Sequence, residues 1–391
     1  MHRLEHIFVS DLVPKRYADF GPALHEAARR ATGLSDFGND DYRDGLARAL
    51  SAFEADLPDD SETRAKAFAF TLPGLIGRLH SQEGWTSEPQ CLADPLVRPL
   101  IIAGIPRTGT TALHQLLALD PRFQGLESWI IPNPIVRPLR NTWPAHPLYR
   151  AAVERAELIE RANARAVALH RIEPWDVDEC LALMMQTFVT NQLPSLLDLP
   201  SYDDWYLAQD ELSSYRRLAD NLRLIGHAER ARTWLLKNPT HFLRIGSLLE
   251  VFPDACVILT RRDPVATLVS LSSMLAAYRG DPAPGSPEAR RIGPRQLRVY
   301  EQATIHTRAV RSRRPEQFHE VHQRELAIDP MAVVRGIYAR FDLELASPTD
   351  AKMKAWIAAQ PGRDAVLERG RRGETPEDFG LSAGEIRERL A

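Results

Sequence analysis

The sequence predicts an α/β protein with a mostly parallel central sheet flanked by helices, plus a helical N-terminal extension. Short apolar runs typical of buried parallel strands recur after residue 96, and each is followed by a turn and a stretch of helical periodicity. Before residue 96, apolar residues recur at helical spacing instead. We therefore expect a helical extension over residues 1–95 and an α/β domain over residues 96–391 that forms one structural unit.

Composition and charge narrow the classes of function. Of the 391 residues, 44% are hydrophobic and 26% are charged, as in an ordinary globular protein. The net charge of −3 gives no general attraction to nucleic acid, so we expect none as a partner. Three widely spaced cysteines argue against a disulfide framework and suit the cytoplasm. The N-terminus lacks a signal-like apolar stretch and no apolar run approaches the ~20 residues that span a bilayer, so we expect a cytoplasmic protein with no transmembrane segment.

Helical spacing marks the segments outside the predicted sheet. Apolar residues recur with this spacing over residues 46–57, and a second apolar stripe over residues 68–79 is interrupted by Pro73-Gly74. Residues 145–230 are largely helical and polar. Residues 280–294, rich in Pro and Gly, predict a loop, either a lid over a neighbouring site or a plain surface loop.

The predicted sheet starts with the apolar run Leu100–Ala103. Helical periodicity resumes over residues 110–119, and Asp120-Pro121 stops it. Strand, loop and helix in this order form the first half of a βαβ unit. Two later apolar runs, residues 233–236 and 255–260, predict further strands, each followed by a turn and a helix.

The octapeptide Gly104–Thr111 lies where a phosphate-binding loop would lie, between a buried strand and the N-terminus of a helix. Backbone N–H groups point at a common centre there, and the helix dipole favours an anion. The spacing of Gly104 and Gly109 matches a nucleoside-triphosphate loop, but Thr110 replaces the lysine that would reach the β- and γ-phosphates. This argues against a triphosphate ligand, and Arg107 supplies the cation instead. The alternative is a generic strand-to-helix turn capped by Gly and Thr.

The segment Pro106-Arg107-Thr108-Gly109-Thr110-Thr111 resembles the 5′-phosphosulfate-binding loop of sulfotransferases that use 3′-phosphoadenosine 5′-phosphosulfate (PAPS). Its form is common in bacterial enzymes and in protein-tyrosine sulfotransferases. The resemblance continues in Asp120-Pro121, in residues 235–241 and 257–264, and in residues 377–381. It therefore covers most of the chain.

The resemblance implies a P-loop-type fold and in-line transfer of a sulfuryl group from PAPS to an acceptor hydroxyl, carried by a small molecule or a lipid. It implies adenosine 3′,5′-bisphosphate (PAP) as the product and no metal. His319 and His322 would face opposite sides of a strand, which also argues against zinc. The loop residues expected to bind the nucleotide are Pro106, Arg107, Thr108, Gly109, Thr110 and Thr111.

A second anion site is predicted where Arg262 closes a strand and Asp263 caps the next helix. The family places an Arg here and a Ser eight residues later, both on the 3′-phosphate, which implies this role for Arg262 and Ser270. The alternative is a structural pair of Arg262 with Asp263. The segment Arg371-Arg372-Gly373 resembles a basic loop that also contacts the 3′-phosphate, although a solvated charge run is an equal alternative.

Sulfuryl transfer needs a base for the acceptor proton and cations for the leaving oxygen. Glu127 is one candidate base, because protein-tyrosine sulfotransferases and several bacterial enzymes place their catalytic Glu at much this distance from the loop. His241 is the rival, because animal cytosolic enzymes use a His close after a Lys, although the spacing here is Lys237-x-x-x-His241. We favour Glu127, with Lys237 and Arg107 acting on the leaving group. A solvated loop acid and a helix-opening polar residue are the structural alternatives for Glu127 and His241.

Two other functions are open at this level. A nucleotide-dependent phosphotransferase with a degenerate loop would need an acid for Mg²⁺ at a strand end, and the obvious one, Asp263, is expected to cap a helix. A catalytically silent nucleotide-binding protein would keep the loop but would have no need of Glu127, Lys237 and His241. Fold and nucleotide motifs do not identify the acceptor, because that depends on the acceptor pocket.

Overall fold

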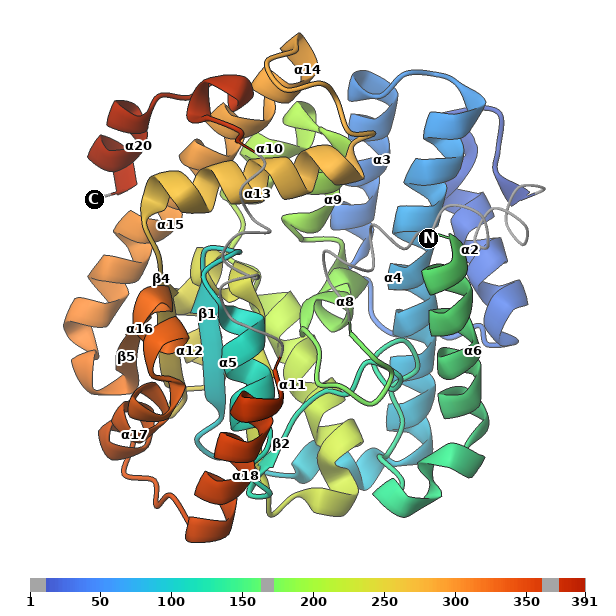
Figure 1. Ribbon diagram of the computed structural model, residues 1–391. Helices are drawn as coiled ribbons and strands as arrows, with labels where there is room; N and C mark the ends of the chain where they lie inside the picture. Colours follow the sequence, from blue (N-terminus) through green and yellow to red (C-terminus); the bar gives the residue numbers. More distant parts are fainter. Residues whose placement is uncertain (1–11, 163–171, 361–372, 391) are drawn as a thin grey trace. The chain divides into compact units, whose positions relative to one another are not determined.

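The computed structural model describes residues 12–162, 172–360 and 373–390 (Figure 1). The chain divides into two compact units, each built from two separate stretches of sequence. The first unit holds residues 1–96 and 126–231, and the second holds residues 97–125 and 232–391. The organisation into an extension over residues 1–95 and a domain over residues 96–391 stays a prediction.

The first unit is built from helices. Its α-helices are α2 (Phe20–Thr32), α3 (Arg43–Asp56), α4 (Ser61–Ser87), α6 (Pro147–Ala162), α8 (Leu181–Met184), α9 (Gln192–Leu197), α10 (Pro200–Leu207) and α11 (Leu212–Gly226). Its 3₁₀ helices are η2 (Tyr17–Asp19), η3 (Pro89–Ala93), η4 (Arg140–Ala145), η5 (Met185–Thr187) and η6 (His227–Glu229). The helix α4 runs without a break through Pro73, contrary to the interruption that the sequence suggested. Tertiary packing stabilises the helix across the lost hydrogen bond, because its buried face continues on both sides of Pro73 through Leu72 and Leu75. Gly74 leaves room there for the Phe188 ring, which would lie 2.9 Å from an added Cβ.

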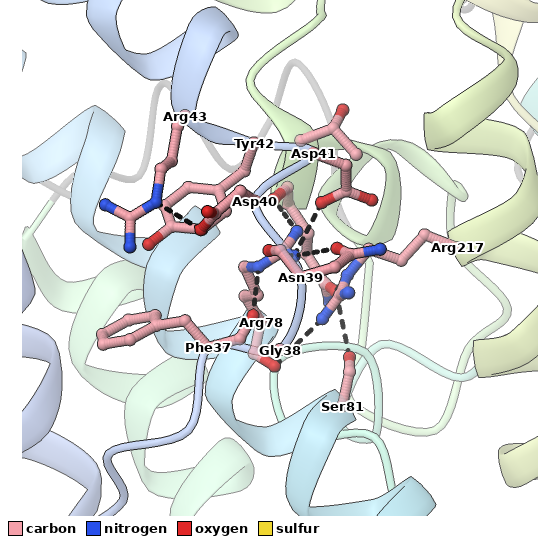
Figure 2. A network of polar contacts seen from close by, with 12 residues as sticks. Phe37, Gly38, Asn39, Asp40, Asp41, Tyr42, Arg43, Arg78, Ser81 and Arg217 are labelled. Atoms are coloured by element: carbon pink, nitrogen blue, oxygen red, sulfur yellow. Dashed lines mark hydrogen bonds and ion pairs between the residues drawn. The ribbon is translucent and has the colours of Figure 1, made fainter.

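Three arginines are buried in the described part of the first unit, and two of them, Arg78 on α4 and Arg217 on α11, belong to one polar network (Figure 2). Arg78 is completely buried, donates to the carbonyl oxygens of Phe37 and Asn39, and forms an ion pair of 2.6 Å with Asp41. These partners come from the segment between α2 and α3. Arg78 therefore ties that segment to α4.

Arg217 continues this network. Its Nε donates to Oε1 of Gln186 over 2.6 Å, its Nη2 donates to the carbonyl of Arg78 over 3.1 Å, and its guanidinium lies 4.6 Å from the centre of the Trp85 ring. Burial, and then the charge of Arg78, lower the pKa of Arg217 to about 9. Ser81 donates to the same Gln186 oxygen, so one amide links α4, η5 and α11.

The second unit contains a five-stranded sheet with the order β2-β3-β1-β4-β5. The strands are β1 (Leu100–Gly104), β2 (Phe123–Gln124), β3 (Thr233–Lys237), β4 (Cys256–Arg261) and β5 (Phe318–His322). Every pair of neighbours is parallel, and Leu100 stands in register with Leu235 on one side and with Cys256 on the other. The predicted parallel sheet is therefore confirmed.

Helices surround this sheet in the second unit. The α-helices are α5 (Thr110–Leu117), α12 (Ile245–Val251), α13 (Pro264–Tyr278), α14 (Pro287–Arg290), α15 (Ile292–Arg313), α16 (Gln323–Ile328), α17 (Pro330–Arg340), α18 (Ser347–Ala359) and α20 (Ala383–Leu390). The 3₁₀ helices are η7 (Pro239–Arg244), η8 (Pro315–Gln317) and η9 (Pro376–Phe379). Ile102, Leu235 and Ile258 of the three central strands pack with α5, α17 and α18 in one buried cluster (Figure 1).

The segment predicted as a loop over residues 280–294 is partly helical. Ser286 accepts a hydrogen bond from the N–H of Ala289, and Pro287 occupies the first helical position, so the one-turn helix α14 forms there. The long helix α15 then starts at Ile292, before the predicted loop ends. Among the described residues, no helix is long and apolar enough to cross a membrane.

Candidate active site

The loop between β1 and α5 has a backbone that depends on its glycines. Gly104 has a φ of +153°, and an added Cβ would lie 2.4 Å from Oγ1 of Thr260 on β4. Gly109 has a φ of +90°, and Arg107 also takes a positive φ, of +74°. The Thr108 hydroxyl donates to the carbonyl of Ile105 and lies 2.6 Å from the Thr260 hydroxyl. The loop is thus fixed to the neighbouring strand.

The loop leads directly into the N-terminus of α5, which starts at Thr110. The first backbone N–H groups of a helix have no partner within the helix, and the dipole gives this end a partial positive charge. Lys237, the last residue of β3, is completely buried, and its Nζ lies 3.4 Å from Oγ1 of Thr111. The ends of two adjacent strands therefore bring a cation to the helix terminus.

Two further cations lie at the same edge of the sheet. The Nε of Arg107 donates to Oγ of Ser270 on α13 over 3.2 Å, and Nη1 of Arg262 donates to the carbonyl of Arg107 over 3.1 Å. Both guanidiniums are half-buried, and burial lowers the pKa of each; the charge of Arg107 lowers the pKa of Arg262 further. Neither forms an ion pair with a carboxylate in the described part of the chain. The charge of Asp263 acts on Arg262 without such a contact, and two guanidiniums that lack a carboxylate contact are suited to an anion.

Asp263 does not compensate these charges by an ion pair. Its carboxylate accepts the N–H of Ala266 over 2.8 Å and so caps α13. The structural pairing of Arg262 with Asp263 that the sequence left open is thus replaced by a helix cap. The side chain of Arg262 is directed to the loop backbone instead.

His241 lies on η7 and is completely buried. The helix starts after Asn238, whose side chain accepts the N–H of Thr240 over 3.0 Å. Burial lowers the pKa of His241 to about 3. The imidazole is therefore neutral at ordinary pH, and its surroundings strongly oppose protonation.

Glu127 belongs to the first unit and is buried. It forms an isolated antiparallel bridge with Val177, and its Oε2 lies 3.0 Å from Nε of Arg137 in an ion pair. Arg137 also pairs with Glu229 through Nη1 at 3.0 Å. No sequence motif points to Arg137, because nine residues of irregular chain lie between it and Glu127.

The structure brings Arg107, Thr111, Lys237, Arg262 and Ser270 together in the second unit. Arg371 and Arg372 lie outside the described residues. Gly373 is described, with a φ of +75° and open space where a Cβ would lie. Within the described ranges, no group of three or more His, Cys, Asp or Glu side chains could hold a metal ion.

The second unit thus combines a parallel α/β sheet with a glycine loop that joins the end of its central strand to a helix N-terminus, which is the architecture of phosphate-loop α/β proteins. Residues 99–347 match the model of the sulfotransferase family, and the chain belongs to this family. This confirms both the family and the P-loop-type fold that the sequence predicted.

Two solved structures are similar to nearly the whole chain. Sulfotransferase STF1 from Mycobacterium tuberculosis H37Rv is 31% identical, with a TM-score of 0.85 over 95% of this chain and 98% of that protein. Sulfotransferase STF9 from Mycobacterium avium is 25% identical, with a TM-score of 0.82 over 94% of each chain.

Among curated proteins, the chain is similar to the omega-hydroxy-beta-dihydromenaquinone-9 sulfotransferases Stf3 of Mycobacterium bovis and Mycobacterium tuberculosis. The identity is 27% over 261 residues. The match covers 64% of this chain and 64% of the length of these relatives.

Proposed function

We propose that the protein transfers a sulfuryl group from PAPS to a hydroxyl of a small molecule or lipid. The observation that carries the proposal is the pair of half-buried guanidiniums, Arg107 and Arg262, which have no carboxylate ion-pair partner in the described part of the chain and lie beside a glycine loop. PAPS would supply the sulfuryl group and a stable phosphate leaving group. A nucleotide with phosphates on both its 5′ and 3′ sides suits two cations at the ends of adjacent strands.

The residues present fit this nucleotide. Arg107 and the N–H groups at the start of α5 would hold the 5′-phosphosulfate, and Arg262 with Ser270 would hold the 3′-phosphate. Lys237 would stabilise negative charge on the leaving oxygen. We keep Arg371, Arg372 and Gly373 as proposed contacts to the 3′-phosphate, and Pro106, Thr108, Gly109, Thr110 and Thr111 as the remainder of the loop site.

We propose Glu127 as the general base. His241 is completely buried and has a pKa of about 3, so it is a poor acceptor for a proton. Glu127 is a carboxylate with one oxygen in an ion pair, and Oε1 has no hydrogen-bond partner among the described residues. An ionised carboxylate with a free oxygen can accept the proton of a hydroxyl as that hydroxyl attacks sulfur.

For the acceptor, we propose a hydroxyl-bearing lipid or small molecule. The name of the Stf3 relatives describes an omega-hydroxylated menaquinone derivative, and this chemistry supports a lipid alcohol as the first class to test. We also propose a cytoplasmic location, where the three buried free cysteines would stay reduced. A screen of lipid, sterol, phenol and sugar hydroxyls with labelled PAPS would identify the acceptor.

Nucleotide selectivity tests the proposed donor. PAP should raise the melting temperature far more than ATP with Mg²⁺ at equal concentration, because the loop lacks the triphosphate lysine and a second anion site is present. Equal stabilisation by ATP with Mg²⁺, and none by PAP, would favour the phosphotransferase instead.

Two variants test the proposed base. Glu127→Gln keeps the shape of the side chain and removes its basicity, so kcat should fall on the order of 10²–10⁴-fold while the Kd for PAP changes little. His241→Asn should reduce kcat much less. An active Glu127→Gln enzyme together with an inactive His241→Asn enzyme would reverse the two roles.

A further inference from the structure

Three charged side chains in the first unit are linked by two ion pairs. Arg137 lies between two carboxylates, with Nε 3.0 Å from Oε2 of Glu127 and Nη1 3.0 Å from Oε2 of Glu229. Burial decreases towards Glu229, because the side chains of Arg137 and Glu127 are 3% and 9% exposed and that of Glu229 is 34% exposed. The buried guanidinium is thus shared between one buried and one partly exposed carboxylate.

The backbone fixes both ends of the inner pair. The segment around Glu127 is held by hydrogen bonds from Asp178 N to the Leu126 carbonyl and from Ser128 N to the Asp176 carbonyl. Arg137 is anchored by its own N–H, which donates to the carbonyl of Ile225 near the end of α11 over 3.0 Å. Glu229 follows on η6, directly after the same helix.

The two oxygens of Glu127 are not equivalent. Oε2 is a buried atom whose 3.0 Å ion pair with Nε of Arg137 lacks hydrogen-bond geometry, whereas Oε1 has neither an ion pair nor a hydrogen-bond partner in the described part of the chain. An ion pair through one oxygen fixes the rotation of the carboxylate and leaves the other oxygen available for a hydroxyl proton.

We propose that Arg137 is a positioning residue that orients Glu127 for proton abstraction, and that Glu229 moderates the effect of its positive charge on that carboxylate. This rests on the proposed function, in which Glu127 is the base. In general, a guanidinium that contacts a single carboxylate holds it in place but also favours its charged form. A second carboxylate on the same guanidinium offsets the effect of its positive charge and leaves the ion pair with the first carboxylate in place.

In the proposed step, the acceptor oxygen forms a bond to sulfur while the bond from sulfur to the phosphate oxygen breaks, and that electron pair leaves with PAP. The acceptor proton moves to Oε1 of Glu127. Arg137 stays protonated throughout and remains on Oε2. Arg137 therefore takes no part in proton transfer and acts only by orienting Glu127 and through its charge.

Removing the positive charge of Arg137 and removing the negative charge of Glu229 should change the pH dependence of kcat in opposite directions, which tests the proposal. Arg137→Gln removes the cation, so the acid limb of the profile should move to higher pH by about one unit, with a lower kcat. Glu229→Gln removes the moderating charge, so the acid limb should move to lower pH. Arg137→Lys keeps the charge and should keep the limb near its wild-type position while restoring part of kcat.

Other titratable groups on the packed elements are the same in all three variants. They include Asp176 and Asp178 on the paired segment, Glu173 before it, Arg140 on η4, whose charge acts on Asp176, and His227 on η6, which pairs with Asp94 at 2.6 Å. Opposite movements of the acid limb in Arg137→Gln and Glu229→Gln therefore come from the charges of Arg137 and Glu229 themselves.

The Kd for PAP and the melting temperature of each variant are measured beside kcat. If the acid limb of Glu229→Gln stays in place or moves to higher pH, the proposal is wrong, and this holds even where Arg137→Gln fails to fold, because Glu229 is partly exposed. Glu127→Gln separates this failure from the failure of the proposed function. Normal turnover of Glu127→Gln would reject Glu127 as the base. Loss of turnover in Glu127→Gln, together with an unmoved acid limb in Glu229→Gln, would reject only the role of Arg137 and Glu229.

Discussion

One buried pair of arginines, Arg78 and Arg217, and one half-buried pair, Arg107 and Arg262, differ in what surrounds them. In the first unit, Arg78 and Arg217 donate to backbone carbonyls and to the Gln186 amide, and Arg78 pairs with Asp41 (Figure 2). In the second unit, Arg107 and Arg262 each have a single hydrogen bond among the described residues, and neither has a carboxylate partner. Burial lowers the pKa in all four cases, so burial alone does not distinguish the pairs.

The two pairs of arginines differ in how many hydrogen bonds their guanidiniums already make within the protein. A guanidinium offers five N–H donors, and a buried one that uses them on its own protein joins segments of the chain. A guanidinium that keeps most of its donors beside a phosphate-type loop is prepared for a ligand. We therefore expect Arg78 and Arg217 to serve stability, and Arg107 and Arg262 remain the proposed binding residues.

The largest expected effect is at Arg78. Arg78→Met removes a completely buried cation from Asp41 and from the carbonyls of Phe37, Asn39 and Gln186, and should cost about 3–5 kcal/mol of the free energy of unfolding. Urea denaturation would measure it, with Arg30→Met as the control, because Arg30 forms only an exposed pair with Glu26. A variant as stable as the wild type would remove the distinction between the two pairs.

Arg107→Ala should weaken nucleotide binding and leave the stability of the protein nearly unchanged, the reverse of Arg78→Met. We expect on the order of 10²-fold weaker PAP binding and a lower kcat, because the side chain would contact the phosphosulfate in both ground and transition states. The melting temperature without nucleotide should change little. Titration calorimetry and thermal unfolding measure the two quantities, and a large loss of stability with intact affinity would place Arg107 with the structural arginines.

Arg262→Ala should have a smaller and more selective effect. Loss of the charge-assisted contact should weaken PAP binding by roughly 1.5–3 kcal/mol and leave binding of adenosine 5′-phosphate nearly unchanged. The control is Arg261→Ala, because the preceding arginine is already paired with Glu320 at 2.6 Å. Equal losses for both nucleotides would show that Arg262 supports the loop rather than the 3′-phosphate.

The smallest effect concerns His241 and the pH dependence of stability. Its pKa is about 3 in the folded protein and 6.5 ordinarily, so between these values the unfolded chain binds a proton that the folded chain does not. Stability must therefore fall as pH decreases through this window. His241→Asn should reduce the drop in melting temperature between about pH 7 and pH 5 by roughly 2–4 °C. The control variant His322→Asn, at an exposed position on β5, should keep the wild-type drop.

The sequence predicted the central strands because they are buried on both faces. Leu100–Ala103 and the later runs in β3 and β4 are continuous apolar stretches, and no polar alternation obscures them. β5 carries buried Phe318 and Val321 between polar residues, so it lacked that signal. β2 has only two residues, too few for any pattern. Pro73 suggested a break because sequence rules see the lost hydrogen bond but not the packing of Gly74 on Phe188.

The site was predictable where it is local in sequence. The loop from Gly104 to Thr111 is a contiguous motif, and Arg262 with Ser270 has a fixed spacing on one strand and helix. Arg137 contacts Glu127 in the same irregular stretch and Glu229 on a short helix about a hundred residues later. No sequence periodicity could indicate contacts of this kind. Arg78 had a weak signal, a single charge within the apolar stripe of residues 68–79, which marks a cation facing the interior.

The strand order also has a consequence for the biosynthesis of the second unit. β1 pairs with β3 and β4, both encoded well over a hundred residues after it. At about 5–20 residues per second, β1 leaves the ribosome on the order of ten seconds before either neighbour. Its apolar edges, Leu100 to Ala103, are without sheet partners for that interval. We therefore expect this unit to fold late, to refold slowly because of its high contact order, and to depend on chaperones more than the helical unit that is largely synthesised first.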